Sequence, residues 1–178
     1  MPSRIALGLI ALAASLAAGS ARADGSVVIE GFAGWQSLRP SANGLANAAS
    51  GREGTAILGA DILGRMDVFG LGVSIDKTTS GSNGQPWAGA VLAGFLIDPL
   101  PSLRLEALGE VGRRATAFGD MFNSTGKTFL GFRPGVSVRL VPAPIRIGVS
   151  VPIRWNTSGG SFSSPDYGFV GRVGFEFP

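Results

Sequence analysis

The stretch "PIRIGVSVPIRW", residues 144–155, decides the fold of this chain. Large apolar side chains occupy every second position from Ile145 to Trp155, and Arg146 and Arg154 stand among the residues between them. Alternation with a period of two is typical of a β-strand with two unlike faces. In a soluble protein the apolar face forms the core. In a membrane barrel it contacts lipid, and the arginines point into the lumen. The rest of the sequence has to distinguish these two arrangements.

The same alternation recurs along the chain. We predict eight strands, at 27–35, 55–66, 68–76, 87–98, 103–112, 128–140, 144–155 and 167–177. Short connections (67, 98–102 and 141–144) take turns with long polar ones (36–54, 77–86, 113–127 and 156–166). All the short connections therefore lie at one end of an up-and-down sheet. Eight strands of about 9–11 residues with tight turns at one end favour a small transmembrane β-barrel.

The first 23 residues have the pattern of a cleavable signal peptide. A basic residue, Arg4, precedes an apolar run over residues 5–18, and Ala21 and Ala23 provide the small residues expected before a cleavage site. The apolar run is shorter than the roughly 20 residues that a membrane-spanning helix needs. We therefore predict a signal peptide over residues 1–23 and one exported barrel domain over residues 24–178.

Composition excludes several kinds of chemistry. The 178 residues include no cysteine and no histidine. Disulfides, thiol chemistry, the usual general base near neutral pH and the commonest metal ligand are thus all absent. Beyond the predicted signal peptide the chain has 13 basic and 12 acidic residues, so it lacks the excess of basic residues that is typical of nucleic-acid-binding proteins. Glu106 and Glu110 share a strand face, but about 13 Å separates them, too far for a glycosidase pair. We predict no catalytic residue, cofactor, metal or nucleic-acid partner.

Aromatic residues favour the membrane arrangement. The tryptophans and the tyrosine fall on the apolar faces at the long-loop ends of their strands, whereas several phenylalanines fall on the same faces near the short turns. Aromatic belts at two opposite rims are typical of membrane interfaces. We predict that the girdles include Trp35, Trp87, Trp155, Tyr167, Phe175 and Phe177.

The polar faces indicate a filled lumen. Their basic residues are all arginine, which pairs well with carboxylates in confined spaces. An eight-stranded barrel is just wide enough to be filled by its own side chains. We predict a lumen ion-pair cluster in which Arg172 meets Glu30 and Arg133 lies level with Glu106; the whole cluster comprises Glu30, Asp61, Glu106, Glu110, Arg133 and Arg172. Pro134 and Pro152 interrupt neighbouring strands, and a shared β-bulge is expected there.

With these features the sequence resembles the small eight-stranded outer-membrane barrels of Gram-negative bacteria, the class that includes the OmpA transmembrane domain and OmpX. The resemblance covers nearly all of residues 25–178. Members of this class end in an aromatic residue, and the final "VGFEFP" departs from that pattern because Pro178 follows Phe177. The resemblance implies an all-β, antiparallel, monomeric barrel in the outer membrane, assembled by the barrel-assembly machinery. The expected partners are outer-membrane lipid and lipopolysaccharide, and the expected role is structural or interactive. A narrow channel for small solutes or ions and a soluble periplasmic or secreted carrier remain as alternatives.

Overall fold

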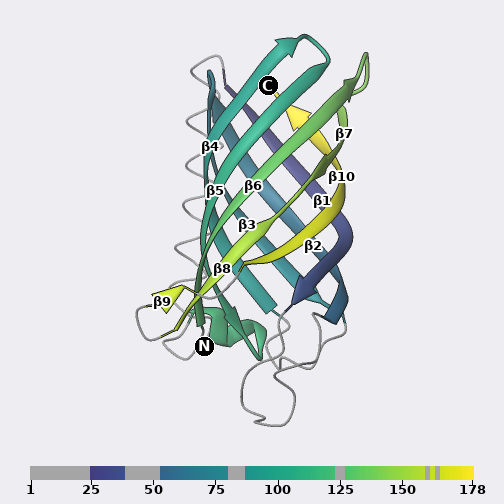
Figure 1. Ribbon diagram of the computed structural model, residues 1–178. Coiled ribbons are helices and arrows are strands. Elements are labelled where there is room, and N and C mark those ends of the chain that lie inside the picture. Colours follow the sequence, from purple (N-terminus) through teal and green to yellow (C-terminus); the bar gives the residue numbers. More distant parts are fainter. Residues whose placement is uncertain (1–24, 39–52, 80–86, 123–126, 159–160, 163–164) are drawn as a thin grey trace.

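The computed structural model describes residues 25–38, 53–79, 87–122, 127–158, 161–162 and 165–178. These residues form a β-barrel with one short 3₁₀ helix (Figure 1). The elements are β1 (Gly25–Leu38), β2 (Glu53–Met66), β3 (Phe69–Thr78), β4 (Trp87–Leu100), β5 (Leu103–Ala115), η1 (Phe118–Phe122), β6 (Lys127–Leu140), β7 (Ile145–Ser150), β8 (Ile153–Ser158), β9 (Ser161–Phe162) and β10 (Asp166–Phe177).

Each strand pairs antiparallel with its neighbours, and the sheet closes on itself. The order β1 to β7 follows the chain, and β1 also pairs with β10, from Val27 opposite Phe177 to Ser37 opposite Tyr167. β7 and β8 are two halves of one barrel strand, because each pairs with β6 on one side and β10 on the other. The prediction of a closed, eight-stranded, up-and-down barrel is confirmed.

The two ends of the barrel differ as the connections predicted. The turns at 67–68, 101–102 and 141–144 lie at the end where β1 begins and β10 finishes, whereas η1 and β9 lie at the opposite end (Figure 1). Asp67, in the first of these turns, has a φ of 54°, a left-handed conformation that aspartate adopts more readily than most residues. We call the two ends the turn end and the loop end.

Strand boundaries differ modestly from those predicted. β1 continues to Leu38 and β5 to Ala115, so both strands reach further toward the loop end than the alternation indicated. The predicted signal peptide, residues 1–23, lies outside the described residues. In the part of the chain that the structure describes, no helix is long and apolar enough to cross a membrane.

The predicted bulge at the two prolines is wrong. Gly135 lies opposite Ser150, and Phe132 lies opposite Ile153, so no extra residue is inserted between β7 and β8. The Val151 amide donates to the Pro134 carbonyl at 2.9 Å, and the Gly168 amide donates to the Pro152 carbonyl at 2.9 Å. Each proline therefore still accepts a hydrogen bond and lacks only the donor that proline never has. The two missing bonds fall on opposite sides of the seventh barrel strand, and the register continues past both prolines.

Candidate functional site

The structure answers which face of residues 144–155 lies inside. Ile147 is 49% exposed on the outer wall and Val149 is 37% exposed, whereas Arg146 and Arg154 are 3% and 1% exposed in the lumen. The other strands follow the same rule, with apolar side chains outside and the charged ones inside. The barrel thus has a charged interior and an apolar exterior, the inverse of a soluble protein.

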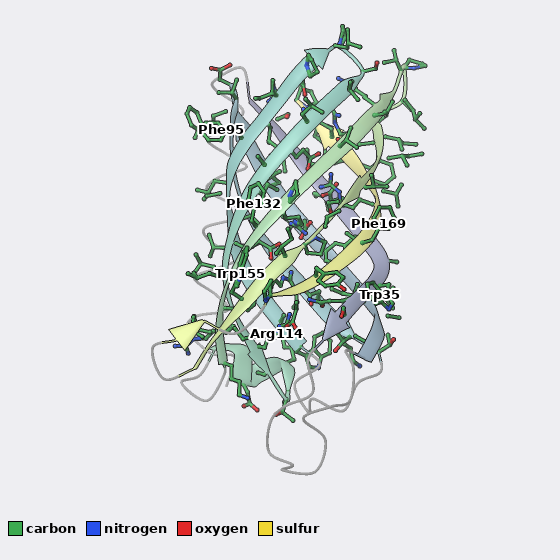
Figure 2. All side chains as sticks on the ribbon, in the orientation of Figure 1. Trp35, Phe95, Arg114, Phe132, Trp155 and Phe169 are labelled. Carbon is green, nitrogen blue, oxygen red and sulfur yellow. The ribbon has the colours of Figure 1, made fainter. Side chains whose placement is uncertain are left out.

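Aromatic side chains are distributed along the outer wall toward both rims. At the loop end Trp35 packs against Tyr167 with ring centroids 6.1 Å apart, and at the turn end Phe69 packs against Phe95 at 5.2 Å. Figure 2 places Phe95 toward the turn end, with Trp35 and Trp155 toward the loop end. All the predicted girdle residues lie on outward positions; Trp35, Tyr167, Phe175 and Phe177 are exposed, and Trp87 and Trp155 are half-buried.

The centre of the lumen holds a branched ion-pair network. Arg133 contacts Asp61 at 2.9 Å and Glu110 at 3.2 Å. The other oxygen of Glu110 meets Arg154 at 2.7 Å, and Arg154 also contacts Asp76 at 2.7 Å. Asp61 and Asp76 come from β2 and β3, whereas Arg133 and Arg154 come from β6 and β8, so the network crosses the barrel from wall to wall.

A second group surrounds Arg172 on β10. Its Nη1 lies 2.8 Å from Glu30 and 2.7 Å from Glu106, so the predicted meeting of Arg172 and Glu30 is found in the structure. The expectation that Arg133 lies level with Glu106 is wrong. In the β5–β6 register Glu106 lies opposite Gly135, two residues along the strand from Arg133. Glu106 therefore pairs with Arg172 rather than with Arg133.

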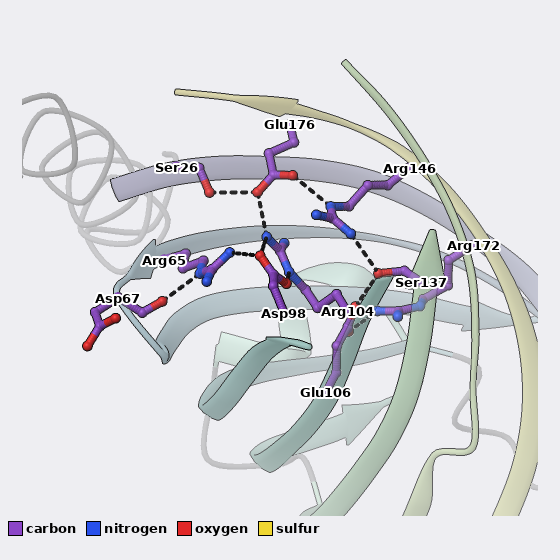
Figure 3. A network of polar contacts seen from close by, with 10 residues as sticks. All are labelled: Ser26, Arg65, Asp67, Asp98, Arg104, Glu106, Ser137, Arg146, Arg172 and Glu176. Atoms are coloured by element: carbon purple, nitrogen blue, oxygen red, sulfur yellow. Dashed lines mark hydrogen bonds and ion pairs between the residues drawn. The ribbon is translucent and has the colours of Figure 1, made fainter. Parts of the chain in front are cut away.

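The turn end of the lumen carries a third group, which Figure 3 shows from close by. Glu176 accepts hydrogen bonds from Arg104 and Arg146, both at 2.7 Å. Arg104 also contacts Asp98 at 2.8 Å, and Arg65 forms an ion pair with the same carboxylate. Ser137 donates to Glu106 at 2.8 Å and accepts from Arg146 at 3.3 Å, which joins this group to the one around Arg172.

A fourth group of polar contacts lies at the loop end of the lumen. Arg114 contacts Asp166 at 3.1 Å, and Asn156 donates to the same carboxylate at 2.9 Å. The Arg114 and Arg154 guanidinium groups both lie over the ring of Phe129, at 5.6 Å and 4.9 Å from its centroid. Cation–π contacts of this kind favour a desolvated cation. Polar contacts thus extend through the lumen from one end to the other.

Opposite charges balance in the described part of the lumen. Each of its eight carboxylates has an arginine within ion-pair distance: Glu30, Asp61, Asp76, Asp98, Glu106, Glu110, Asp166 and Glu176. Eight arginines face them: Arg65, Arg104, Arg114, Arg133, Arg139, Arg146, Arg154 and Arg172. A carboxylate held by a guanidinium is poorly placed to accept a proton or attack a substrate. Within the described residues, no group of three or more metal-ligating side chains is found.

Sequence reasoning missed part of this interior. Asp98, Arg114 and Asp166 join the networks, but Asp98 was predicted at the junction of a strand and a turn, and the other two lay beyond the predicted strand ends. Continued alternation from Glu110 would have placed Arg114 inside, since both are even-numbered positions of β5. The lumen also contains apolar fill that the polar pattern did not indicate, with buried clusters at Val28, Leu63, Leu92, Leu96 and Leu108, at Phe32, Ile57 and Val170, and at Ala88, Ala90 and Phe129.

Comparison with known proteins identifies the fold. The crystal structure of Neisserial surface protein A (NspA) is similar to this chain, with a TM-score of 0.56 and 13% sequence identity over 85% of this chain and 97% of that one. No protein-family model matches the sequence, and no curated protein does either. At this identity the likeness concerns the fold alone. The chain has the fold of a small eight-stranded outer-membrane β-barrel.

Proposed function

We propose that the protein resides in the outer membrane as a monomeric barrel, where it has a structural or interactive role and its lumen is closed by its own side chains. The observation that carries this proposal is the inverted distribution of polarity. Exposed large apolar side chains surround the wall, and charged groups are buried inside. Soluble proteins rarely expose apolar surface on this scale. The alternative of a soluble carrier needs Ile147 and Val149 inside, whereas both are on the outer wall.

The closed lumen follows from its contents. Arg133, Arg154 and Arg172 are almost fully buried, and each contacts two carboxylates contributed by other strands. Side chains that meet across the barrel in this way leave little room for a continuous water path. A plug role for the networks therefore has more support than a channel role.

Fractionation and gel mobility test the membrane placement. The protein should require detergent for extraction, and its apparent mass on a gel should differ between unheated and boiled samples. Recovery as a soluble periplasmic protein would contradict the placement. In planar bilayers the purified protein should give no stable large openings, and such openings would favour the channel alternative instead.

Single cysteines test the orientation, since the chain has none of its own. We propose that the loop end faces outward and the turn end faces the periplasm, with lipopolysaccharide around the outer rim. A membrane-impermeant maleimide on whole cells should label Ala117→Cys, beside η1, and should leave Asp67→Cys in the first turn unlabelled until the membrane is permeabilised. The reverse pattern would overturn the orientation.

A further inference from the structure

A polar cavity of about 390 Å³ opens at the turn end of the lumen. Four arginines line it (Arg65, Arg104, Arg139 and Arg146), together with two carboxylates, Asp98 and Glu176. Cations therefore outnumber the acidic side chains in the wall of this cavity. This excess positive charge is available to a ligand only if the two carboxylates already accept hydrogen bonds from the other arginines.

Both oxygens of each carboxylate already have partners. Asp98 accepts from Arg104 at 2.8 Å through Oδ1, and through Oδ2 it contacts Arg65 and Arg104. Glu176 accepts from Ser26 at 2.8 Å and from Arg104 at 2.7 Å through Oε1, and from Arg146 at 2.7 Å through Oε2. Every oxygen of the two carboxylates thus already accepts at least one hydrogen bond from a described residue, and Arg139 is not among these donors. Three of the four arginines are thus neutralised within the protein.

Arg139 is the remaining one. In the described part of the chain it forms no ion pair, and its Nε is shielded from solvent without a hydrogen-bond partner. In the β6–β7 register it lies directly opposite Arg146, and like charges in that position destabilise a sheet. Among the described residues of the cavity wall, Arg139 is therefore the arginine that has no ion pair.

We propose that the cavity at the turn end binds an oxyanion, the carboxylate or phosphate group of a ligand, with Arg139 as the main contact and Arg146 beside it. A guanidinium offers two parallel N–H donors to such a group, and charge-assisted pairs of this kind are among the stronger hydrogen bonds. The inference rests on the proposed function only for placing the site on the periplasmic side. There the oxyanion comes either from a lipid headgroup or from a soluble anion.

Titration with inorganic phosphate tests the site. In neutral detergent micelles at constant ionic strength, phosphate replacing chloride should shift the Nε–H nuclear magnetic resonance signals of Arg139 and Arg146 in a saturable manner. In the Arg139→Gln variant the Arg146 signal reports binding, and the phosphate affinity should fall by about tenfold or more. Arg139→Lys should retain part of the affinity because it keeps the charge but loses the planar fork. Absence of a saturable shift, or equal affinity in Arg139→Gln, would overturn the proposal.

Two controls separate this test from other causes. Arg113→Gln makes the same substitution on the outer wall near the loop end and should leave phosphate affinity unchanged; a loss as large as that in Arg139→Gln would show a non-specific charge effect. Each variant must also keep its heat-modifiable gel mobility, so that misfolding is not read as lost binding. Failure of membrane insertion would be seen in the fractionation experiment, independently of the phosphate titration.

Lipid nanodiscs distinguish the two sources of the oxyanion. If a headgroup occupies the site, phosphatidylglycerol should shift the same arginine signals without added phosphate and should weaken phosphate binding relative to discs of phosphatidylcholine alone. If the source is a soluble anion, phosphate affinity should be equal in both kinds of disc.

Discussion

Removing Arg172 should cost more stability than removing any one of its partners. Its Nη1 lies within 2.8 Å of both Glu30 and Glu106, and the residue is 3% exposed. Arg172→Ala leaves Glu30 without an ion pair in the described part of the chain, whereas Glu106 keeps its hydrogen bond from Ser137. Breaking a buried pair costs roughly 3–5 kcal/mol because a charge is left uncompensated. Because both carboxylates lose their ion pair with Arg172, we expect a loss of about 5 kcal/mol, at the upper end of that range.

The partner substitution should be milder, and the two should be coupled. Glu30→Ala leaves Arg172 paired with Glu106, so its cost should fall at or below about 3 kcal/mol. In the double variant the stranded charge of Glu30 is gone, and the cost should be less than the sum of the single costs, by about 0.5–3 kcal/mol. Arg65→Ala serves as a matched control, because Arg65 and Asp98 are both partly exposed and such pairs contribute about 1 kcal/mol or less.

Equilibrium unfolding provides the measurement. The barrel is reconstituted in lipid vesicles, urea is titrated, and the fluorescence of the three tryptophans reports unfolding. Free energies for the parent, the three single variants and the double variant complete the cycle. Two results would refute the assignment of a buried ion pair while leaving the barrel fold intact. One is that the costs of Glu30→Ala and Arg172→Ala are additive in the double variant. The other is that Arg172→Ala costs no more than Arg65→Ala.

Three further experiments test the barrel strands. Val149→Arg should lower the free energy of unfolding by about 2–4 kcal/mol in bilayers and by much less in micelles. Ser150→Arg is directed into the lumen, so its cost should be the same in both media. Refolding titrations in bilayers and in micelles compare the two variants. Gly174→Ala places a Cβ 2.4 Å from a lumen side chain and should cost roughly 1–3 kcal/mol, whereas Gly171→Ala, with its nearest neighbour at 3.8 Å, should stay within about 0.5 kcal/mol in urea unfolding. Pro134→Ala restores a ladder donor, so it should slow local amide hydrogen exchange and add about 0.5–1.5 kcal/mol.

The faces of the strands are predictable from sequence because the side-chain period in a strand is two. Once Arg146 is assigned to the lumen, every even position of that strand follows, and the same logic fixes the other strands. Strand ends are less predictable. Residues 113–115 continue β5 although Arg113 and Arg114 read as the start of a polar loop. The pattern gives no separate signal for where a charged strand residue gives way to a charged loop residue.

Contacts across the lumen are not predictable by the same means. Which residues lie level depends on register, and register depends on turn geometry and on the stagger that closes the barrel. Arg133 was expected near Glu106, yet a two-residue offset carries it to Asp61 and Glu110 instead. Arg154 and Asp76 come from strands that are not neighbours, so their contact depends on the width of the barrel.

Alternation also explains why a charged interior suits a membrane barrel of this size. Buried ion pairs are weak contributors to stability, and apolar residues would fill the lumen at least as well in energetic terms. Strands that were apolar on both faces, however, would approach the composition of a membrane-spanning helix, which needs about 20 apolar residues. The most apolar strand, β4, has its apolar run closed at Asp98, and it is the strand whose lumen side is filled by Leu92 and Leu96. Charges on the lumen faces of the other strands keep each apolar run short while their mutual pairing offsets the cost of burial.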